Sequence, residues 1–177
     1  MSSLIEENIN KLIRECIDTI LGIPMYSIRA NQDAPRPKTA YASVSISSFA
    51  NVSLEETEYS DNEDGTITET IRSPRNLLVS INTYRELAKD RASAIRIGMM
   101  RSSILEKLNA SNVGLGNRSE VISIPEDLGT GWEERANLTI TLNIVDEDSD
   151  SINSIESVGI QGEYQSNSNI TNLSIEV

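Results

Sequence analysis

The spacing of apolar residues predicts two amphipathic helices. Apolar side chains recur every three or four residues from residue 4 to residue 21, which places them on one face of a helix. Ser3 and Glu6 fit a capping box at its start, and Gly22-Ile23-Pro24 ends it. A second helix is predicted over Asp90–Leu108. The apolar positions are Leu4, Ile5, Ile9, Leu12, Ile13, Cys16, Ile17, Ile20 and Leu21 in the first helix, and Ala92, Ile95, Met99, Ile104 and Leu108 in the second.

Between these helices the pattern changes to the strict alternation of two long strands, from Tyr41 to about Tyr84. Asp61-Asn-Glu-Asp-Gly65 supplies the turn, and the arms nearest to it, from Glu55 to Thr70, are polar or acidic on both faces. A strand over residues 42–59 would extend roughly 60 Å, whereas a compact domain of this length is about 40 Å across. We therefore expect a hairpin that projects from the body, with sharp bends at bulges as the alternative.

The rest of the chain also favours strands. Residues 112–116 are expected to form a loop, and a short strand over 121–124 and a turn-rich stretch over 125–131 follow. The clearest alternation puts Leu138, Ile140, Leu142 and Ile144 on one face of a strand. The acidic run Asp146–Asp150 should stop this strand. Two more alternating runs lie at residues 158–164 and 173–177.

The order of these elements predicts an α+β fold. We expect a largely antiparallel β-sheet, flanked by two α-helices on one face, with a long projecting β-hairpin. Residues 1–146, including the hairpin 41–84, would form one domain. Residues 147–177 would form a C-terminal extension with one or two strands, which adds an edge strand to the same sheet or pairs with a neighbouring chain.

Composition narrows the functions that this fold could carry. The 177 residues include no histidine and one cysteine, and the formal charge is −12. Without histidine there is no Ser-His-Asp or Cys-His nucleophile and no imidazole base. One cysteine cannot form an intrachain disulfide, and Cys16 is expected in the core. A strongly negative chain is also ill suited to binding the phosphate backbone of nucleic acids. We therefore predict that the protein is not an enzyme.

The sequence also lacks the motifs of calcium sites, dinucleotide sites and targeting segments. The acidic clusters at residues 60–71 and 146–157 lack the glutamate that an EF-hand calcium loop needs at its last position. Gly114-Leu-Gly116 lacks the third glycine of a dinucleotide fingerprint. No metal or cofactor is therefore expected. The acidic N-terminus and the absence of a long apolar run predict a cytosolic protein without a signal peptide or a membrane span.

Arginines form a loose basic zone around the predicted second helix: Arg72, Arg75, Arg85, Arg91, Arg96 and Arg101. Two interpretations stay open. The zone is a charged solvent face, balanced by Glu86, Asp90 and Glu106, or it meets the acidic hairpin of an adjacent subunit in a head-to-tail ring.

Several segments together resemble the phage neck or tail-terminator protein family. Asn31-Gln-Asp-Ala-Pro-Arg-Pro-Lys38, followed by Tyr41-Ala-Ser-Val-Ser-Ile46, is similar to the segment that leads into the sheet in that family. The order of helix, long hairpin and helix after Tyr84-Arg85 matches, as does Trp132-Glu-Glu-Arg-Ala136 before an alternating strand. The resemblance covers roughly residues 1–146.

This resemblance implies a structural virion protein of the tail or neck, assembled in the host cytoplasm. Such proteins form a hexameric ring that caps the tail tube, ends its polymerisation and faces the head connector. The implied partners are copies of the chain, the tail tube protein, the head–tail connector or adaptor protein, and a sheath protein if the tail contracts. DNA would pass through without specific binding, and no membrane is involved. The resemblance carries over no catalytic residue.

The candidate residues follow from these interpretations. Acidic residues at the hairpin tip, Asp61, Glu63 and Asp64, would line the DNA channel if the tip faces the bore. The candidates for contacts with subunits or partners are Pro35, Arg36, Pro37, Asp61, Glu63, Asp64, Arg85, Arg91 and Arg135. Two alternatives remain at this point: another tail or baseplate adaptor, and an inhibitory binding module whose acidic surface mimics nucleic acid.

Overall fold

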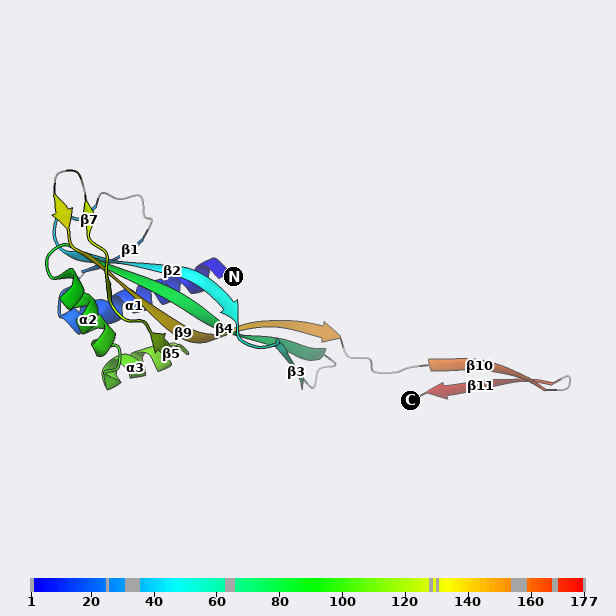
Figure 1. Cartoon of the computed structure of the whole chain (residues 1–177). Helices are drawn as coiled ribbons and strands as arrows, with labels where there is room; N and C mark the ends of the chain where they lie inside the picture. Colours follow the sequence, from blue (N-terminus) through cyan, green and yellow to red (C-terminus); the bar gives the residue numbers. More distant parts are fainter. Residues whose placement is uncertain are drawn as a thin grey trace. The chain divides into compact units, whose positions relative to one another are not determined.

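A computed structural model describes residues 2–24, 26–30, 36–62, 66–127, 129, 131–153, 159–166 and 169–176, with side chains for those between residues 6 and 152 (Figure 1). The fold is α+β with a mostly antiparallel sheet, as the sequence predicts. The elements are α1 (Ser2–Leu21), β1 (Ser27–Arg29), β2 (Tyr41–Asn51), β3 (Glu56–Asp61), β4 (Thr66–Tyr84), α2 (Ala88–Gly98), α3 (Ser102–Asn109), β5 (Gly114–Arg118), β6 (Ile122–Ser123), β7 (Glu126–Asp127), β8 (Trp132–Glu133), β9 (Arg135–Asn153), β10 (Gly159–Ser166) and β11 (Asn169–Glu176).

The chain divides into two compact units. The first, here called the core unit, comprises Met1–Leu54 and Ser73–Asp146. The second, here called the acidic unit, comprises Glu55–Arg72 and Glu147–Val177. The long strands β4 and β9 each contribute residues to both units.

The main sheet has the strand order β1-β2-β4-β9-β5. β1 is parallel to β2, and β2 is antiparallel to β4 with a register shift between Ile46 and Ser48. β3 pairs with β4, from Glu56 opposite Arg72 at one end to Asp61 opposite Ile67 at the other. The predicted hairpin strand of residues 41–59 is thus two strands, β2 and β3, which are both antiparallel to β4. That the hairpin projects stays a prediction.

Helix α1 and the inner face of the sheet form one hydrophobic core. Ile13, Cys16 and Ile17 of α1 are fully buried with the inward side chains of β2, β4 and β9. This confirms the predicted stripe for the residues whose side chains are described; Leu4, Ile5 and the capping box at Ser3 lie outside them. The helix ends as expected, since Gly22 adopts a left-handed φ of 66° and the Ile23 N–H donates to the Asp18 carbonyl.

The predicted second helix over 90–108 is wrong in one respect, because it is two helices, α2 and α3. The backbone turns after Met99, where the N–H groups of Met100 and Arg101 bond the carbonyls three residues back, those of Ile97 and Gly98. In one straight helix, the positions that follow Ile95 and Met99 on the buried face would be Ser102, Ser103 and Glu106. The turn changes which positions of the following helix face the core. The inward side chains of α3 are therefore Ile104 and Leu108, and both are buried.

Residues 112–116, expected as a loop, include the start of β5. Gly114 and Leu115 pair with Asn143 and Leu142 of β9. Gly116 lies so close to β9 that a Cβ there would approach the Thr141 carbonyl oxygen to 3.1 Å. Glycine at this position therefore permits close contact between strands. The short strand predicted over 121–124 is β6, limited to Ile122–Ser123.

Strand β9 confirms the predicted alternation, with Leu138, Ile140 and Leu142 fully buried. It does not stop at Asp146, however, but continues to Asn153. Two arginines of β4 explain how the acidic run stays in the strand. Arg75 pairs with Asp146 at 3.3 Å, and the Arg72 Nε donates to Glu147 at 2.8 Å.

The last two strands pair with each other. β10 and β11 form an antiparallel two-stranded sheet, with Gly159 opposite Glu176 at one end and Ser166 opposite Asn169 at the other. The sequence left open whether residues 147–177 add an edge strand to the main sheet. In the described residues, β10 and β11 form their own sheet.

Candidate partner interface

Three of the predicted interface arginines converge at one end of the sheet in the core unit. They surround two tyrosines and two glutamates supplied by neighbouring strands and by the segment before β2. We call this group the Arg–Tyr cluster; its members are Arg36, Tyr41, Tyr84, Arg85, Glu126, Glu133 and Arg135.

Strand register places the two tyrosines of this cluster. Tyr41 begins β2 and is the partner of Tyr84 at the end of β4. Their rings stack with centroids 4.5 Å apart and an angle of 11° between planes. The guanidinium carbons of Arg36 and Arg135 lie 5.1 and 5.2 Å from the centroid of the Tyr84 ring. These distances suit cation–π attraction, so the stacked pair orders both arginines.

The carboxylate of Glu133 is the buried centre of the cluster. Its side chain is only 7% exposed, and it accepts a 2.6 Å hydrogen bond from Arg36 and lies 3.5 Å from Arg85. The Arg36 Nε also donates to the Tyr41 hydroxyl at 2.7 Å. This hydrogen bond, together with the charges of Glu133 and Glu126, raises the pKa of Arg36, so the guanidinium remains charged. A buried carboxylate requires such pairing, since ionised groups are costly to bury alone.

A strained turn positions Arg85. Arg85 and Leu87 both adopt left-handed backbone, with φ of 69° and 58°, and neither is glycine. The Arg85 N–H donates to the Glu134 carbonyl at 2.7 Å, which ties the turn to the strand that follows Glu133. Such backbone strain costs on the order of 1 kcal/mol per residue and often accompanies functional positions.

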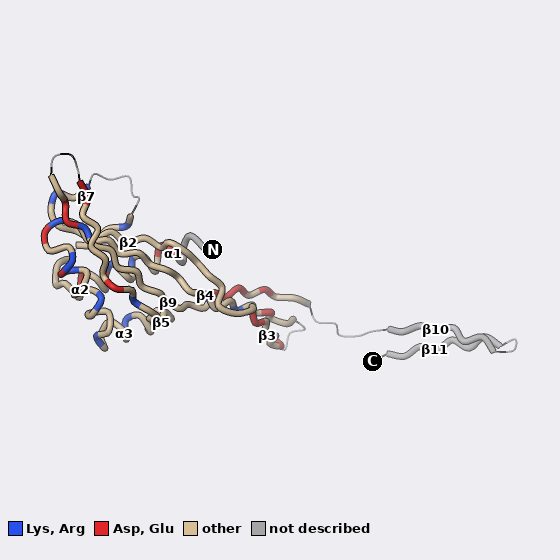
Figure 2. Tube along the Cα trace, in the orientation of Figure 1, with Lys and Arg blue, Asp and Glu red and all other residues tan. Residues whose placement is uncertain are grey.

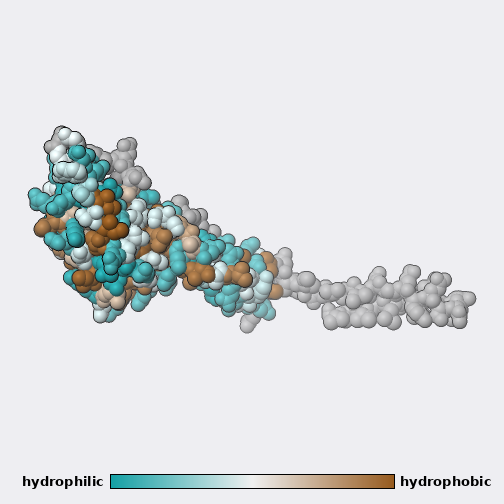
Figure 3. Space-filling model, in the orientation of Figure 1, coloured by the Kyte–Doolittle hydropathy of each residue, from teal (hydrophilic) through white to brown (hydrophobic). Residues whose placement is uncertain are grey.

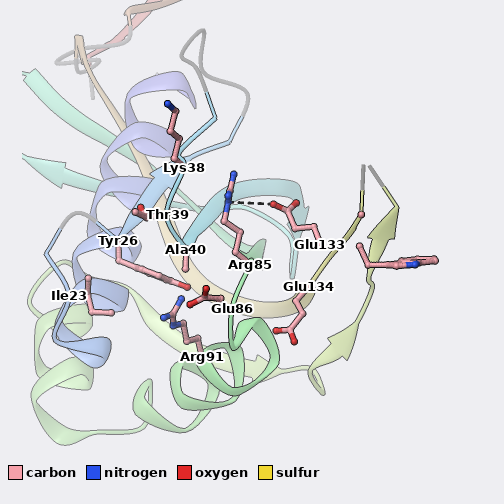
Figure 4. Close-up of a pocket in the computed structure, with 12 residues that line it drawn as sticks. Ile23, Tyr26, Lys38, Thr39, Ala40, Arg85, Glu86, Arg91, Glu133 and Glu134 are labelled. Carbon is pink, nitrogen blue, oxygen red and sulfur yellow. Dashed lines mark ion pairs between the residues drawn. The ribbon is translucent and has the colours of Figure 1, made fainter. Parts of the chain in front are cut away.

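A hollow of about 1030 Å³ lies beside the cluster (Figure 4). Tyr26, 4% exposed, lines it, and the Arg91 guanidinium carbon lies 5.4 Å from the centre of the Tyr26 ring. Burial raises the pKa of the Tyr26 phenol, which therefore stays protonated. The side chains around the hollow are those of Ile23, Tyr26, Lys38, Thr39, Ala40, Arg85, Glu86, Arg91, Trp132, Glu133 and Glu134, with the backbone of Gly131.

Several buried polar atoms around the hollow have no hydrogen-bond partner. Among the described side chains these are the Tyr26 hydroxyl and Arg91 Nη1, which lie next to each other, Arg85 Nε, which faces Glu133 at 3.5 Å, and Arg135 Nε in the cluster. Buried donors are nearly always paired in folded proteins. Guanidinium nitrogens can only donate, so whatever satisfies them must bring acceptors.

The other predicted interface residues are distributed as follows. Pro37 is partly buried next to Arg36, and Asp61 is exposed on β3 in the acidic unit. Pro35, Glu63 and Asp64 lie outside the described residues. Of the basic zone predicted around the second helix, Arg72 and Arg75 form ion pairs on β4, and Arg101 donates to the Ile20 carbonyl. Whether the zone faces solvent or a neighbouring subunit stays a prediction.

Sequence reasoning missed Tyr26, Tyr41, Tyr84, Glu126 and Glu133 as site residues. Tyr41 and Tyr84 begin and end the two strands of the predicted hairpin, so pairing those ends would have brought the rings together. Glu133 belongs to the quoted Trp-Glu-Glu-Arg-Ala segment. For Tyr26, no signal in the sequence pointed to the hollow.

Charge separates the two units sharply. Residues 55–72 and 147–177 hold 13 of the 27 acids but one of the 15 basic residues, Arg72. The acidic unit therefore carries a formal charge of −12, and the core unit is neutral. Figure 2 shows acidic residues along β3 and the distal end of β9. Arg72, the single basic residue of this unit, forms ion pairs with Glu58 and Glu147. The acids of the unit thus greatly exceed its cations in number.

Large apolar side chains are also exposed on the surface. Figure 3 shows the apolar surface as separate patches between hydrophilic ones. Leu54 is 92% exposed, more than any other large apolar side chain among those described, and Trp132 is 75% exposed. Single exposed apolar side chains are normal on protein surfaces, whereas tryptophan is enriched at contacts with partners.

Two kinds of feature are absent from the part of the chain that the structure describes. Within that part, no group of three or more histidine, cysteine, aspartate or glutamate side chains could hold a metal ion. Nor does any described helix have the length and apolar character needed to cross a membrane.

Comparison with known proteins agrees with the resemblance seen in the sequence. A search of curated proteins gave no match. A family model described as phage neck terminator protein matches residues 7–168, which covers most of the core unit, part of the acidic unit and every member of the Arg–Tyr cluster. Proteins of this family are structural components of the virion rather than enzymes. The chain therefore belongs to the phage neck terminator protein family.

Proposed function

We propose that six copies of this chain form a ring at the head-proximal end of the phage tail. The ring ends polymerisation of the tail tube and joins the tail to the head connector. The observation that carries the proposal is the family match over residues 7–168. In this role the protein acts through contacts with other proteins and performs no covalent chemistry.

The charge distribution supports a head-to-tail ring. In such a ring, one patch of each subunit meets a different patch of its neighbour, so two unlike surfaces are needed on one chain. The neutral core unit exposes the Arg–Tyr cluster, and the acidic unit carries the whole formal charge of −12. These two surfaces are chemically distinct, as the arrangement requires.

The same charge suits a passage for DNA. Six copies, each with a formal charge of −12, would repel the phosphate backbone from any acidic wall, so DNA would slide rather than bind. We assign Asp61, Glu63 and Asp64 to this wall. Replacing all three with lysine should slow DNA ejection from assembled virions. Unchanged ejection kinetics would remove these residues from the channel.

Further partners follow from the position in the neck. The ring would contact the tail tube protein on one side and the connector or adaptor protein on the other, and a sheath protein if the tail contracts. Assembly would take place in the host cytoplasm. An adaptor at the distal end of the tail is the competing position for a protein of this fold.

Loss of the protein during infection tests the proposal most directly. Without the chain, tubes should grow to abnormal lengths and heads should remain separate, and supplying the wild-type chain should restore joined particles. Electron microscopy of negatively stained lysates measures both properties. Normal tails joined to heads would contradict the proposal, and labelled protein at the distal tip would favour the adaptor.

A further inference from the structure

We propose that the hollow beside Tyr26 and Arg91 receives the Leu54-Glu55-Glu56 segment of a second copy of the chain. The inference rests on the proposed ring and names the two surfaces that would join its subunits. Both surfaces belong to described residues of the same chain.

Unpaired donors indicate what the hollow binds. The Tyr26 hydroxyl and Arg91 Nη1 are buried next to each other, and neither has a well-formed hydrogen bond to any other described group. In Figure 4 the Tyr26 hydroxyl points toward the Arg91 guanidinium. A guanidinium has no acceptor, and its strongest partner is a carboxylate, which can accept two hydrogen bonds at once. The occupant should therefore bring a carboxylate between these two side chains.

The acids around the hollow leave these donors unpaired. Glu133 is engaged by Arg36 and Arg85, and the Glu134 carboxylate lies 3.4 Å from the Ala88 N–H. The third acid, Glu86, is exposed and lies near Arg91 in Figure 4, but among the described residues no ion pair joins the two. A carboxylate from outside would thus add bonds without displacing a partner of Arg91.

Apolar walls give the occupant a second requirement. Ile23, Ala40 and Trp132 line the same hollow, and Trp132 is 75% exposed. Covering this surface removes apolar area from water, which favours binding. The occupant should therefore carry an apolar side chain next to its carboxylate.

The Leu54-Glu55-Glu56 segment has this combination. Leu54 is 92% exposed, and the side chains of Glu55 and Glu56 are exposed beside it. Residues 52–55 lie between β2 and β3, outside both strands, and the Val52 N–H donates to the Pro74 carbonyl, which anchors the start of the segment. The segment also begins the acidic unit, whose formal charge of −12 complements the cations Arg91 and Lys38 of the hollow.

A complementation experiment tests the pairing with the full chain. The hollow variant is Arg91→Glu, and the segment variant is Leu54→Ser with Glu55→Gln and Glu56→Gln. Each alone should lose ring formation, with an association constant reduced at least about tenfold. Mixed in equal amounts, they should form dimers with one copy of each, because only one intact hollow and one intact segment remain per pair. Native mass spectrometry distinguishes these species by mass.

Two further single substitutions distinguish loss of the subunit contact from loss of folding. Tyr26→Phe removes only a hydroxyl, which lies against the Arg91 guanidinium, so the fold should be unchanged by circular dichroism while ring association weakens about tenfold. Lys89→Glu makes the same charge reversal as Arg91→Glu on the same helix, but Lys89 is exposed and does not line the hollow. This control should form rings like the wild-type chain.

The outcomes separate the inference from the ring itself. Wild-type rings together with intact Arg91→Glu rings, intact Tyr26→Phe rings, or equal losses in Lys89→Glu and Arg91→Glu would overturn the inference and leave the ring standing. A mixture that stays monomeric, or that forms full rings, would also overturn it. A wild-type chain that remains monomeric both in solution and on tail tubes would overturn the ring, and the inference with it.

Discussion

The core unit and the acidic unit of this chain are held together by different forces. In the core unit, one hydrophobic cluster joins the three helices to the sheet, and its formal charge is zero. In the acidic unit, none of the side chains described at residues 55–62, 66–72 and 147–152 is buried, and the formal charge is −12. The strand pairing of β3 with β4 and the ion pairs of Arg72 hold its described part together.

This difference indicates that one unit supplies the stability of the fold and the other is suited to assembly. Burial of apolar area is the main favourable term in folding, so the core unit supplies most of the free energy of unfolding. Repulsion among like charges opposes the compact state of the acidic unit. A neutralising partner would relieve that repulsion, which favours a role for this unit in assembly.

The largest expected effect comes from matched changes on one strand. Ile81 of β4 is fully buried in the core unit, whereas Ile67 of β4 is only partly buried in the acidic unit. Ile81→Ala should lower the free energy of unfolding by about 3–4 kcal/mol, and Ile67→Ala by less than about 1 kcal/mol. Chemical denaturation measures both. Equal losses would show that the two units depend on burial alike.

A second prediction concerns the buried carboxylate of the Arg–Tyr cluster. Glu133→Gln removes the charge that pairs with Arg36 and Arg85, and should lower the free energy of unfolding by about 2–3 kcal/mol. Glu126, 45% exposed, is the control in the same cluster, and Glu126→Gln should cost about 0.5 kcal/mol. The prediction fails if thermal denaturation gives the two variants the same loss.

How far the sequence leads also differs between elements. Apolar residues at every third or fourth position predicted α1, and alternating apolar residues predicted β4 and the buried face of β9. Burial of apolar side chains determines these elements. The break between α2 and α3 was visible in the five-residue spacing from Met99 to Ile104, which one straight helix cannot place on one face. β5 was missed since Gly114 and Gly116 have low strand propensity, and close packing on β9 outweighs that preference.

The candidate site shows what local patterns cannot supply. Arg36, Arg85 and Arg135 could be named from the sequence, but their convergence depends on the register of β2 with β4 and on the turn at Arg85. The continuation of β9 past Asp146 depends on Arg72 and Arg75, which lie more than 70 residues earlier in the chain. Such pairings are tertiary, so no window of neighbouring residues contains them.

A third prediction uses pH to separate the units. Burial raises the pKa of the Cys16 thiol and of the Tyr26 phenol, both in the core unit. In the unfolded chain the thiol loses its proton near about pH 8.5 and the phenol near about pH 10, so this stability is present below about pH 8.5 and falls as pH rises. The free energy of unfolding should therefore decrease between pH 8 and pH 10. Cys16→Ser with Tyr26→Phe should flatten this slope; an equally steep slope in the double variant would assign the effect elsewhere.

The smallest expected effect is a response to salt. Raising NaCl from 0.05 to 0.5 M shortens the Debye length from about 14 to about 4 Å and screens repulsion within the acidic unit. Amide exchange of β3, measured by mass spectrometry, should slow about two- to threefold. Exchange of β9 at residues 137–144, in the neutral core unit, should not change. Equal slowing in both strands would contradict the proposed contrast.

The single tryptophan of the chain has a practical consequence. Trp132 is exposed and lines the hollow, and no other indole contributes to emission. Its fluorescence spectrum is therefore a built-in optical reporter of whether that hollow is wet or covered. A shift of the maximum toward the blue, with reduced quenching by acrylamide, would follow subunit joining in real time without any attached dye.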